Sequence, residues 1–220
     1  METLISLYRS SVGKKLLMGL TGFCLCGFLI FHLGGNMLLF KSDSGRAFDA
    51  YADVLPALYF IRIIELVLFA IILFHIFMGT LLWFKNKFTR PETYEENNPG
   101  ENSSLTSRTM FLTGSIVFVF LVIHMRSFWF TSRYQAGENF SMYALVKSSF
   151  GSPAYSLLYV AAMVILAFHL HHGFQSAMQT FGLRNRKYER LIDLAGMVFW
   201  LLIPLFFALM PVYFLLNLNS

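Results

Sequence analysis

The chain is poor in charge, and poorest in acidic residues. Only 13% of its 220 residues are charged, and 12 are Asp or Glu. Soluble domains carry about 25% charged residues. Apolar residues make up 56% of this chain, and its mean hydropathy is +0.59. These values exclude an ordinary soluble domain and indicate a protein that is solvated by lipid.

Cysteine is equally scarce. The chain has two, Cys24 and Cys26, which lie two positions apart inside an apolar run. A helix points such residues about 200° away from each other. A disulfide or a shared metal between them is therefore excluded, and we interpret both as small apolar helix residues.

Five long apolar runs dominate the sequence, and polar connections separate them. They cover residues 16–40, 59–84, 110–130, 154–181 and 191–216. Each is close to or above the roughly 20 residues of a membrane-spanning helix and far longer than a barrel strand. We predict one all-α membrane domain over residues 1–220, with five transmembrane helices and the first four in an up-down bundle. Pro204 and Pro211 predict a kink in the fifth helix.

The positions of Lys and Arg predict the topology. The formal net charge of +5 would suggest nucleic acid in a soluble chain, but most of these cations flank the apolar runs. Lipid headgroups are their expected partners, and no nucleic acid partner is expected. Eleven of the 17 lie in the N-terminal tail and in the second and fourth connections. We therefore expect a cytoplasmic N-terminus and a C-terminus on the opposite side of the membrane.

Histidine is the most informative residue type in the chain. All six histidines lie inside apolar runs: His32, His75, His124, His169, His171 and His172. An ionisable ring inside the bilayer is costly without a partner, so it suggests function. An interhelical hydrogen bond explains one such ring, but it explains poorly why each of four consecutive helices carries one.

The depth of these histidines predicts two pairs. Each of His32, His75, His124 and His169 lies just beyond the midpoint of its span. Because successive spans run in opposite directions, His32 and His124 lie toward the outer face, and His75 and His169 lie toward the cytoplasmic face. The two levels are roughly 10 Å apart. Two imidazoles at one level are the axial ligands of a haem iron, so we predict two haem b groups and one-electron transfer.

Glycine spacing distinguishes the candidates on the fourth span. Gly79 follows His75 by four residues, and Gly173 follows His169 by four, so each lies one turn from its histidine. A flat macrocycle needs such clearance. His172 has no glycine at that offset and is the weaker candidate, and His171 points to another face. The second nitrogen of each ligand is expected to donate to the backbone carbonyl one turn earlier.

The order of these histidines, with the segments His75–Gly79, Phe168–Gly173 and Ser10–Lys15, resembles a known family. This family is the five-helix di-haem cytochrome b anchor subunit of succinate dehydrogenase and quinol:fumarate reductase. The resemblance implies electron transfer between an iron–sulfur subunit and a membrane quinone, which we expect to be menaquinone. It also implies a flavoprotein subunit that holds the succinate site, which this chain lacks, and a place in the tricarboxylic acid cycle. Because the Ser10–Lys15 segment looks like that of bacterial members, the resemblance further implies a bacterial inner membrane with the C-terminus in the periplasm. Some members carry a glutamate at the position of Ala167, so its absence favours a succinate-oxidising member.

Few charged residues lie just inside the outer face, and three of them are quinone-site candidates. Arg62 and Glu65 could pair on one helix face, which is their simplest interpretation. Alternatively, Glu65 handles a quinone proton, and Arg62 or Arg126 meets quinone or haem propionates.

Two other functions remain open. One is the cytochrome b subunit of a hydrogenase or a formate dehydrogenase, which keeps the haems and changes the complex. The other is a transporter lined by histidines. A transporter relay needs acidic partners, and Glu65 is the one acidic residue well inside a predicted span.

Overall fold

A computed structural model of the chain describes residues 10–88, 109–137 and 139–217. These residues are almost entirely helical, and no strand occurs among them. The long elements are α2 Ser11–Asn36, α4 Tyr59–Phe88, α7 Met110–His124, α10 Pro153–Thr180 and α12 Ile203–Leu216. The short ones are η1 Met37–Phe40, α3 Arg46–Ala57, η2 Met125–Phe130, α8 Thr131–Tyr134, α9 Met142–Phe150, α11 Glu189–Met197 and η3 Val198–Leu202.

Together these elements give five helical stretches that are long and apolar enough to cross a membrane. They are Ser11–Phe40, Tyr59–Phe88, Met110–Tyr134, Pro153–Thr180 and Glu189–Leu216. The predicted all-α membrane fold with five spans is therefore confirmed, and the chain is a multi-pass membrane protein.

Local sequence explains where the helices begin and end. The Ser10 hydroxyl accepts a hydrogen bond of 2.8 Å from the Gly13 amide and caps α2. Proline stands in the first turn of α10, where its missing N–H costs nothing. After that helix Gly182 adopts a φ of 68°, a conformation that suits glycine. α4 continues to Phe88, one turn beyond the prediction, and the rest of the predicted loop, at 89–108, lies outside the described residues.

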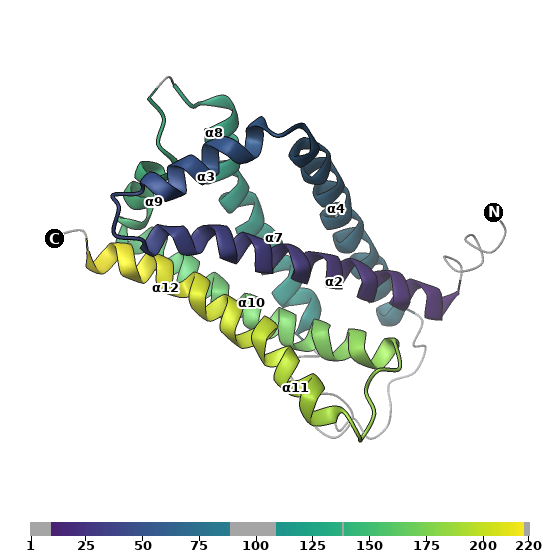
Figure 1. Ribbon diagram of the computed structural model, residues 1–220. Coiled ribbons are helices and arrows are strands. Elements are labelled where there is room, and N and C mark those ends of the chain that lie inside the picture. Colours follow the sequence, from purple (N-terminus) through teal and green to yellow (C-terminus); the bar gives the residue numbers. More distant parts are fainter. Residues whose placement is uncertain (1–9, 89–108, 138, 218–220) are drawn as a thin grey trace.

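The helices α2, α4, α7 and α10 form the four sides of the bundle (Figure 1). Around it α2 packs on α4, α7 packs on α10, α10 packs on α2, and a looser contact joins α4 to α7. The diagonal partners, α2 with α7 and α4 with α10, are not among the helix pairs in substantial backbone contact. α12 lies outside this square, against α10 and α2. The helices on each diagonal are therefore separated, and side chains occupy the space between them.

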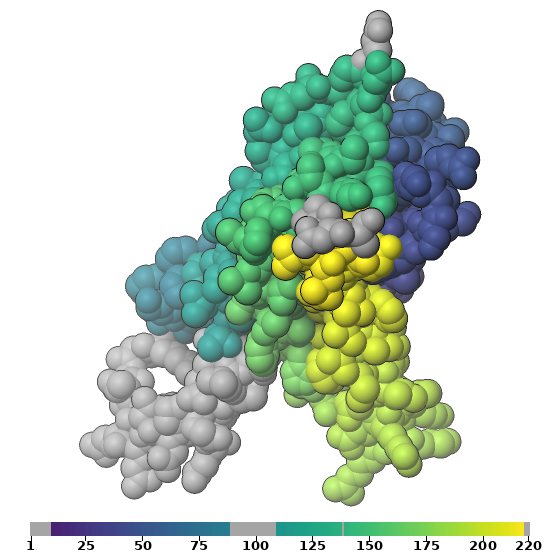
Figure 2. Space-filling view, turned by 90° about the vertical axis from the view of Figure 1, so that its left-hand side faces the viewer, coloured from purple at the N-terminus to yellow at the C-terminus, as the bar shows by residue number. Residues whose placement is uncertain are grey.

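Two short helices in the connections, α3 and α9, were not expected from the sequence. They lie together at the end of the bundle where α2 and α12 finish, and Figure 2 shows this end covered by α3, α9 and the end of α12. Asp49 of α3 joins them, because its carboxylate accepts hydrogen bonds from the Ser141 hydroxyl at 2.7 Å and the Tyr143 amide at 2.8 Å. A buried apolar cluster joins these two helices to the ends of the spans. Its members are Leu39, Phe48, Phe128, Val146, Phe150, Tyr159, Met210 and Phe214.

Two spans contain a π-helical turn. In the third span, η2 begins directly after His124. In the fifth, η3 ends two residues before Pro204, which is where a kink was predicted, while Pro211 lies inside the continuous helix α12. π-helical turns insert an extra residue and are frequent at functional sites. Because of η2, the side chains after His124 face other directions than they would in a regular α-helix.

Candidate functional site: two histidine pairs inside the bundle

Four imidazoles meet as two pairs, each across one diagonal of the bundle. His32 on α2 faces His124 on α7, with ring centres 5.8 Å apart and ring planes at 89°. His75 on α4 faces His169 on α10, with ring centres 6.4 Å apart and ring planes at 70°. The structure thus brings together the partners that the depth argument predicts. We call His32 and His124 the outer pair and His75 and His169 the inner pair, after the predicted topology.

The two pairs lie at distinct levels along the helices. On α2, Thr21 contacts His75 of the inner pair, and His32 of the outer pair follows eleven residues later. Eleven residues correspond to about 16 Å of helix. The two pairs therefore lie at different positions along α2, as the sequence predicts.

Aromatic rings surround the outer pair. Phe28 stacks on His32, one turn away on the same helix, with ring centres 5.2 Å apart. Phe120 and Phe128 flank His124 at 5.8 and 5.4 Å. Phe128 belongs to η2, so the π-helical turn supplies one of these rings. The outer imidazoles therefore lie in a largely apolar environment.

Hydroxyl groups bind the second nitrogen of two of the four imidazoles. His75 Nδ1 lies 3.0 Å from the Thr21 hydroxyl, and His124 Nδ1 lies 3.2 Å from the Tyr159 hydroxyl. The expectation that backbone carbonyls one turn earlier bind these nitrogens is wrong for both. Side-chain hydroxyls on neighbouring helices reach the nitrogens instead.

The inner pair is closely approached by glycines on the neighbouring helices. A Cβ added to Gly114 of α7 would lie 3.2 Å from His169 Cε1, and one added to Gly22 of α2 would lie 3.7 Å from His75 Cε1. His169 Nδ1 is buried without a hydrogen-bond partner among the described residues, so the carbonyl one turn earlier does not bind this ligand either. Sequence reasoning missed both glycines, because the pattern along one helix does not show which residues of another helix face it.

The glycines that the sequence singled out face methionines. A Cβ at Gly79 would meet the methyl group of Met18 at 3.3 Å, and one at Gly173 would meet the methyl group of Met110 at 3.8 Å. Flexible methionines of neighbouring helices therefore lie next to both glycines, and the clearance for a macrocycle stays a prediction.

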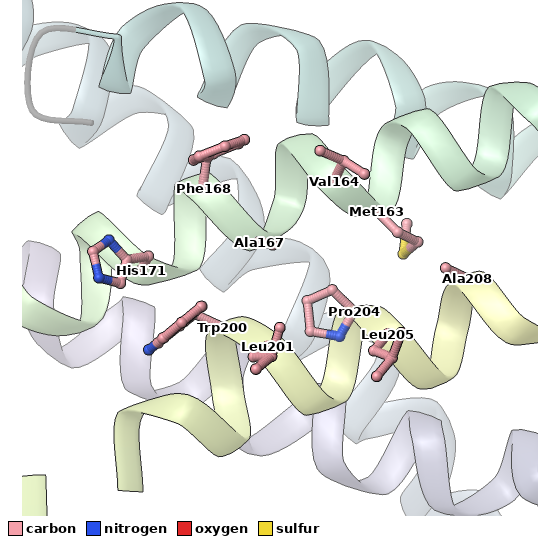
Figure 3. Close-up of a pocket in the computed structure, with 10 residues that line it drawn as sticks. All are labelled: Met163, Val164, Ala167, Phe168, His171, Trp200, Leu201, Pro204, Leu205 and Ala208. Atoms are coloured by element: carbon pink, nitrogen blue, oxygen red, sulfur yellow. The ribbon is translucent and has the colours of Figure 1, made fainter. Parts of the chain in front are cut away.

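The remaining two histidines stand apart from the pairs. His171 lies 3.0 Å from the Gln175 amide nitrogen, and its ring meets Trp200 at 4.9 Å. Figure 3 shows it at one end of an apolar groove of about 440 Å³ between α10 and α12. The prediction that His171 points to another face is confirmed. His172 is half-buried and contacts no other imidazole ring among the described residues.

A second polar site lies between α4 and the end of the third span. The Arg133 guanidinium contacts both carboxylate oxygens of Glu65, at 2.7 and 2.9 Å, and the Trp129 indole N–H donates to the same carboxylate at 2.6 Å. The expected pairing of Glu65 with Arg62 is not formed, because Arg62 donates to the Pro56 carbonyl at 3.3 Å.

Glu65 and Trp129 border a groove of about 400 Å³. Its lining comprises Arg62, Glu65, Leu66, Phe69, Trp129 and Tyr134. Two of the three quinone-site candidates, Arg62 and Glu65, therefore share one groove. The third, Arg126, lies elsewhere, with its guanidinium 4.8 Å from the centre of the Phe130 ring.

The donor set of the pairs fits a haem iron better than a bare metal ion. No group of three or more His, Cys, Asp or Glu that could hold an ion occurs among the described residues. A haem brings four equatorial nitrogens of its own and needs only two axial ligands. With ring centres 5.8 and 6.4 Å apart, the two imidazoles of each pair are close enough that both could bind one iron between them.

Comparisons with models of protein families, with curated proteins and with solved structures give no match for this chain.

Proposed function

We propose that this chain is a di-haem cytochrome b that anchors a succinate:quinone oxidoreductase in the membrane. In this role it transfers electrons between an iron–sulfur subunit and a quinone. The observation that carries the proposal is the pairing of four imidazoles across the two diagonals of the bundle, at two levels. Histidines that only formed interhelical hydrogen bonds would not be expected to pair in this way on four successive helices.

The histidines of each pair would be the two axial ligands of one haem b. His32 and His124 hold the outer group, and His75 and His169 hold the inner one. A haem ligated on both sides by protein supplies one-electron exchange and has no open position for oxygen or substrate. The chain itself holds the imidazoles of each pair close together, and aromatic side chains beside the buried cluster under α3 and α9 shield the outer pair.

The quinone site of the proposal is the groove beside Glu65. Its wall residue Trp129 follows Phe128, whose ring contacts His124. Trp129 is five residues from His124, so the groove lies within about two helical turns of the outer pair along the third span. In the proposal the Glu65 carboxylate exchanges the proton that accompanies quinone chemistry, while Arg133 and Trp129 hold this carboxylate in place. Arg62 stands at the same groove, and Arg126 is left without a role there.

The basic residues at one end of the bundle suggest the topology and the docking side of the partner subunits. The connection between α10 and α11 carries Arg184, Arg186 and Lys187, and α11 carries Arg190. By the positive-inside rule this end is cytoplasmic, so the iron–sulfur subunit would dock there, next to the inner pair. The flavoprotein would bind that subunit, and menaquinone would react at the periplasmic side.

The other two functions predict different behaviour. A histidine-lined transporter needs acidic partners beside its histidines, but the Glu65 carboxylate contacts Arg133 and Trp129 and none of the six histidines. The cytochrome subunit of a hydrogenase or a formate dehydrogenase would also bind two haems. It would differ from our proposal in its electron donor.

The electron donor is therefore the test. In membranes that contain the complete complex, succinate should reduce a b-type spectrum, and a strain lacking this chain is the control. Reduction by hydrogen or formate in place of succinate would contradict the proposed complex. Absence of any reducible b-type spectrum would contradict the haems themselves.

A further inference from the structure

Each histidine pair is asymmetric in the hydrogen bonds of its ring nitrogens. In the inner pair, His75 has a hydroxyl partner at Nδ1, while His169 Nδ1 is buried and has none. In the outer pair, His124 has a hydroxyl partner at Nδ1, and no hydrogen bond reaches the His32 ring from the described residues. One imidazole of each pair thus has a fixed second nitrogen.

Two backbone carbonyls beside the Thr21 hydroxyl bear on which partner donates in its hydrogen bond with His75. The Thr21 hydroxyl lies 3.1 Å from the Leu17 carbonyl and 3.0 Å from the Met18 carbonyl, one turn earlier on α2. Carbonyls only accept, so the hydroxyl can satisfy one of them with its single hydrogen. If it does, the hydroxyl oxygen accepts from His75 Nδ1–H, and the lone pair of His75 is on Nε2.

A chain of two phenols gives His124 the same arrangement. Tyr159 lies 3.2 Å from His124 Nδ1 and 3.0 Å from the Tyr155 hydroxyl. If Tyr159 donates to Tyr155, it accepts from His124 Nδ1–H, and each hydrogen has one acceptor. Tyr159 is 5% exposed and held between the rings of Phe120 and Phe150, so its hydroxyl is fixed in place.

We propose that Thr21 and Tyr159 are positioning residues that hold His75 and His124 as Nε2 ligands and lower the reduction potential of one haem each. This inference rests on the proposed haem ligation. Outer-shell acceptors on a ligand's second N–H fix the ring and raise its basicity. A more basic ligand stabilises the oxidised iron more than the reduced iron. Thr21 acts on the inner haem and Tyr159 on the outer one.

The test is a redox titration of the purified complex, followed by optical spectroscopy. Thr21→Val removes the inner hydroxyl at nearly constant volume, and Thr21→Ser keeps it as the matched control. Tyr159→Phe removes the outer hydroxyl. Its control is Tyr213→Phe, a tyrosine of α12 whose ring contacts Phe40 and Phe214 and touches no histidine.

Removing a hydroxyl should raise the midpoint potential of one haem and leave the other unchanged. We expect reduction of that haem to become about tenfold more favourable, which is about 59 mV for one electron. Thr21→Val and Tyr159→Phe should shift different haems, and both controls should keep the wild-type potentials. If Tyr159→Phe does not assemble, Tyr155→Phe should shift the outer haem in the same direction by a smaller amount.

The outcomes separate this inference from the proposed function. Wild-type protein without haem would end the proposed function and the inference together. Two haems present in each variant at unchanged potentials, or both variants shifting the same haem, would overturn the inference alone. A shift as large in Thr21→Ser as in Thr21→Val would also overturn it, because the hydroxyl would then be irrelevant.

Discussion

His75 and His169 face each other across the α4–α10 diagonal with ring centres 6.4 Å apart, although no substantial backbone contact joins their helices. Ninety-four positions of sequence separate the two residues. Only the interior of the bundle brings them together. A haem held between the two imidazoles, as we propose, would account for side chains that meet although their helices do not pack.

Loss of one member of a pair should remove one whole haem. Replacing His75 or His169 with Ala leaves a single axial imidazole, so both variants should lose the same b-type component. His32→Ala and His124→Ala should lose the other. Spectra of the purified variants measure this directly. Loss of one common component from His75→Ala and His32→Ala would contradict the pairing.

His171 should be dispensable for haem binding. It contacts Gln175 and Trp200 on the groove side of α10 and no member of either pair. His171→Ala should retain both haems and cost about 1 kcal/mol of stability, the value of one hydrogen bond. Haem content and thermal unfolding check this, and loss of either haem would contradict the placement of His171.

A methyl group at Gly114 should disturb the inner pair alone. The added carbon would lie 3.2 Å from His169 Cε1, so the ring must shift. Overpacking of this kind costs about 1–3 kcal/mol. We expect Gly114→Ala to weaken or alter the inner haem and to leave the outer one intact. Gly27→Ala is the matched control, because nothing lies within 4 Å of its added carbon. Equal spectra for both variants would argue against crowding at His169.

Glu65 should serve the quinone reaction and not haem binding. Glu65→Gln keeps the size of the side chain and removes its capacity to exchange a proton, so quinone turnover should fall about 100-fold. Both haems should remain. Arg126→Gln is the comparison, because Arg126 lies over Phe130 and outside the groove. Quinone-dependent kcat measures both, and a larger loss in Arg126→Gln would contradict the assignment of the groove.

Much of this architecture is readable from the sequence, because the membrane imposes simple rules. Apolar length predicts the five spans, which the structure confirms. The alternating direction of the spans predicts which histidines share a level, and the structure places His32 beside His124 and His75 beside His169. These predictions depend only on chain direction and helix rise.

Contacts between helices were not readable in the same way. Thr21, Gly22 and Gly114 each meet a histidine of another helix, and the rotation of a helix about its own axis decides this. Glu65 meets Arg133 at the far end of the third span, which ends in a π-helical turn and α8 that apolar periodicity did not reveal. The caps α3 and α9 were missed because they are short and belong to polar connections.

The most direct test of the account is the haem content of the purified chain. A pyridine haemochrome assay combined with a protein determination gives the number of b-type haems per polypeptide. The two histidine pairs predict a ratio of about two, falling to about one in His75→Ala and in His32→Ala. A ratio near zero in wild-type protein, or an unchanged ratio in these variants, would contradict the assignment of the pairs as haem ligands.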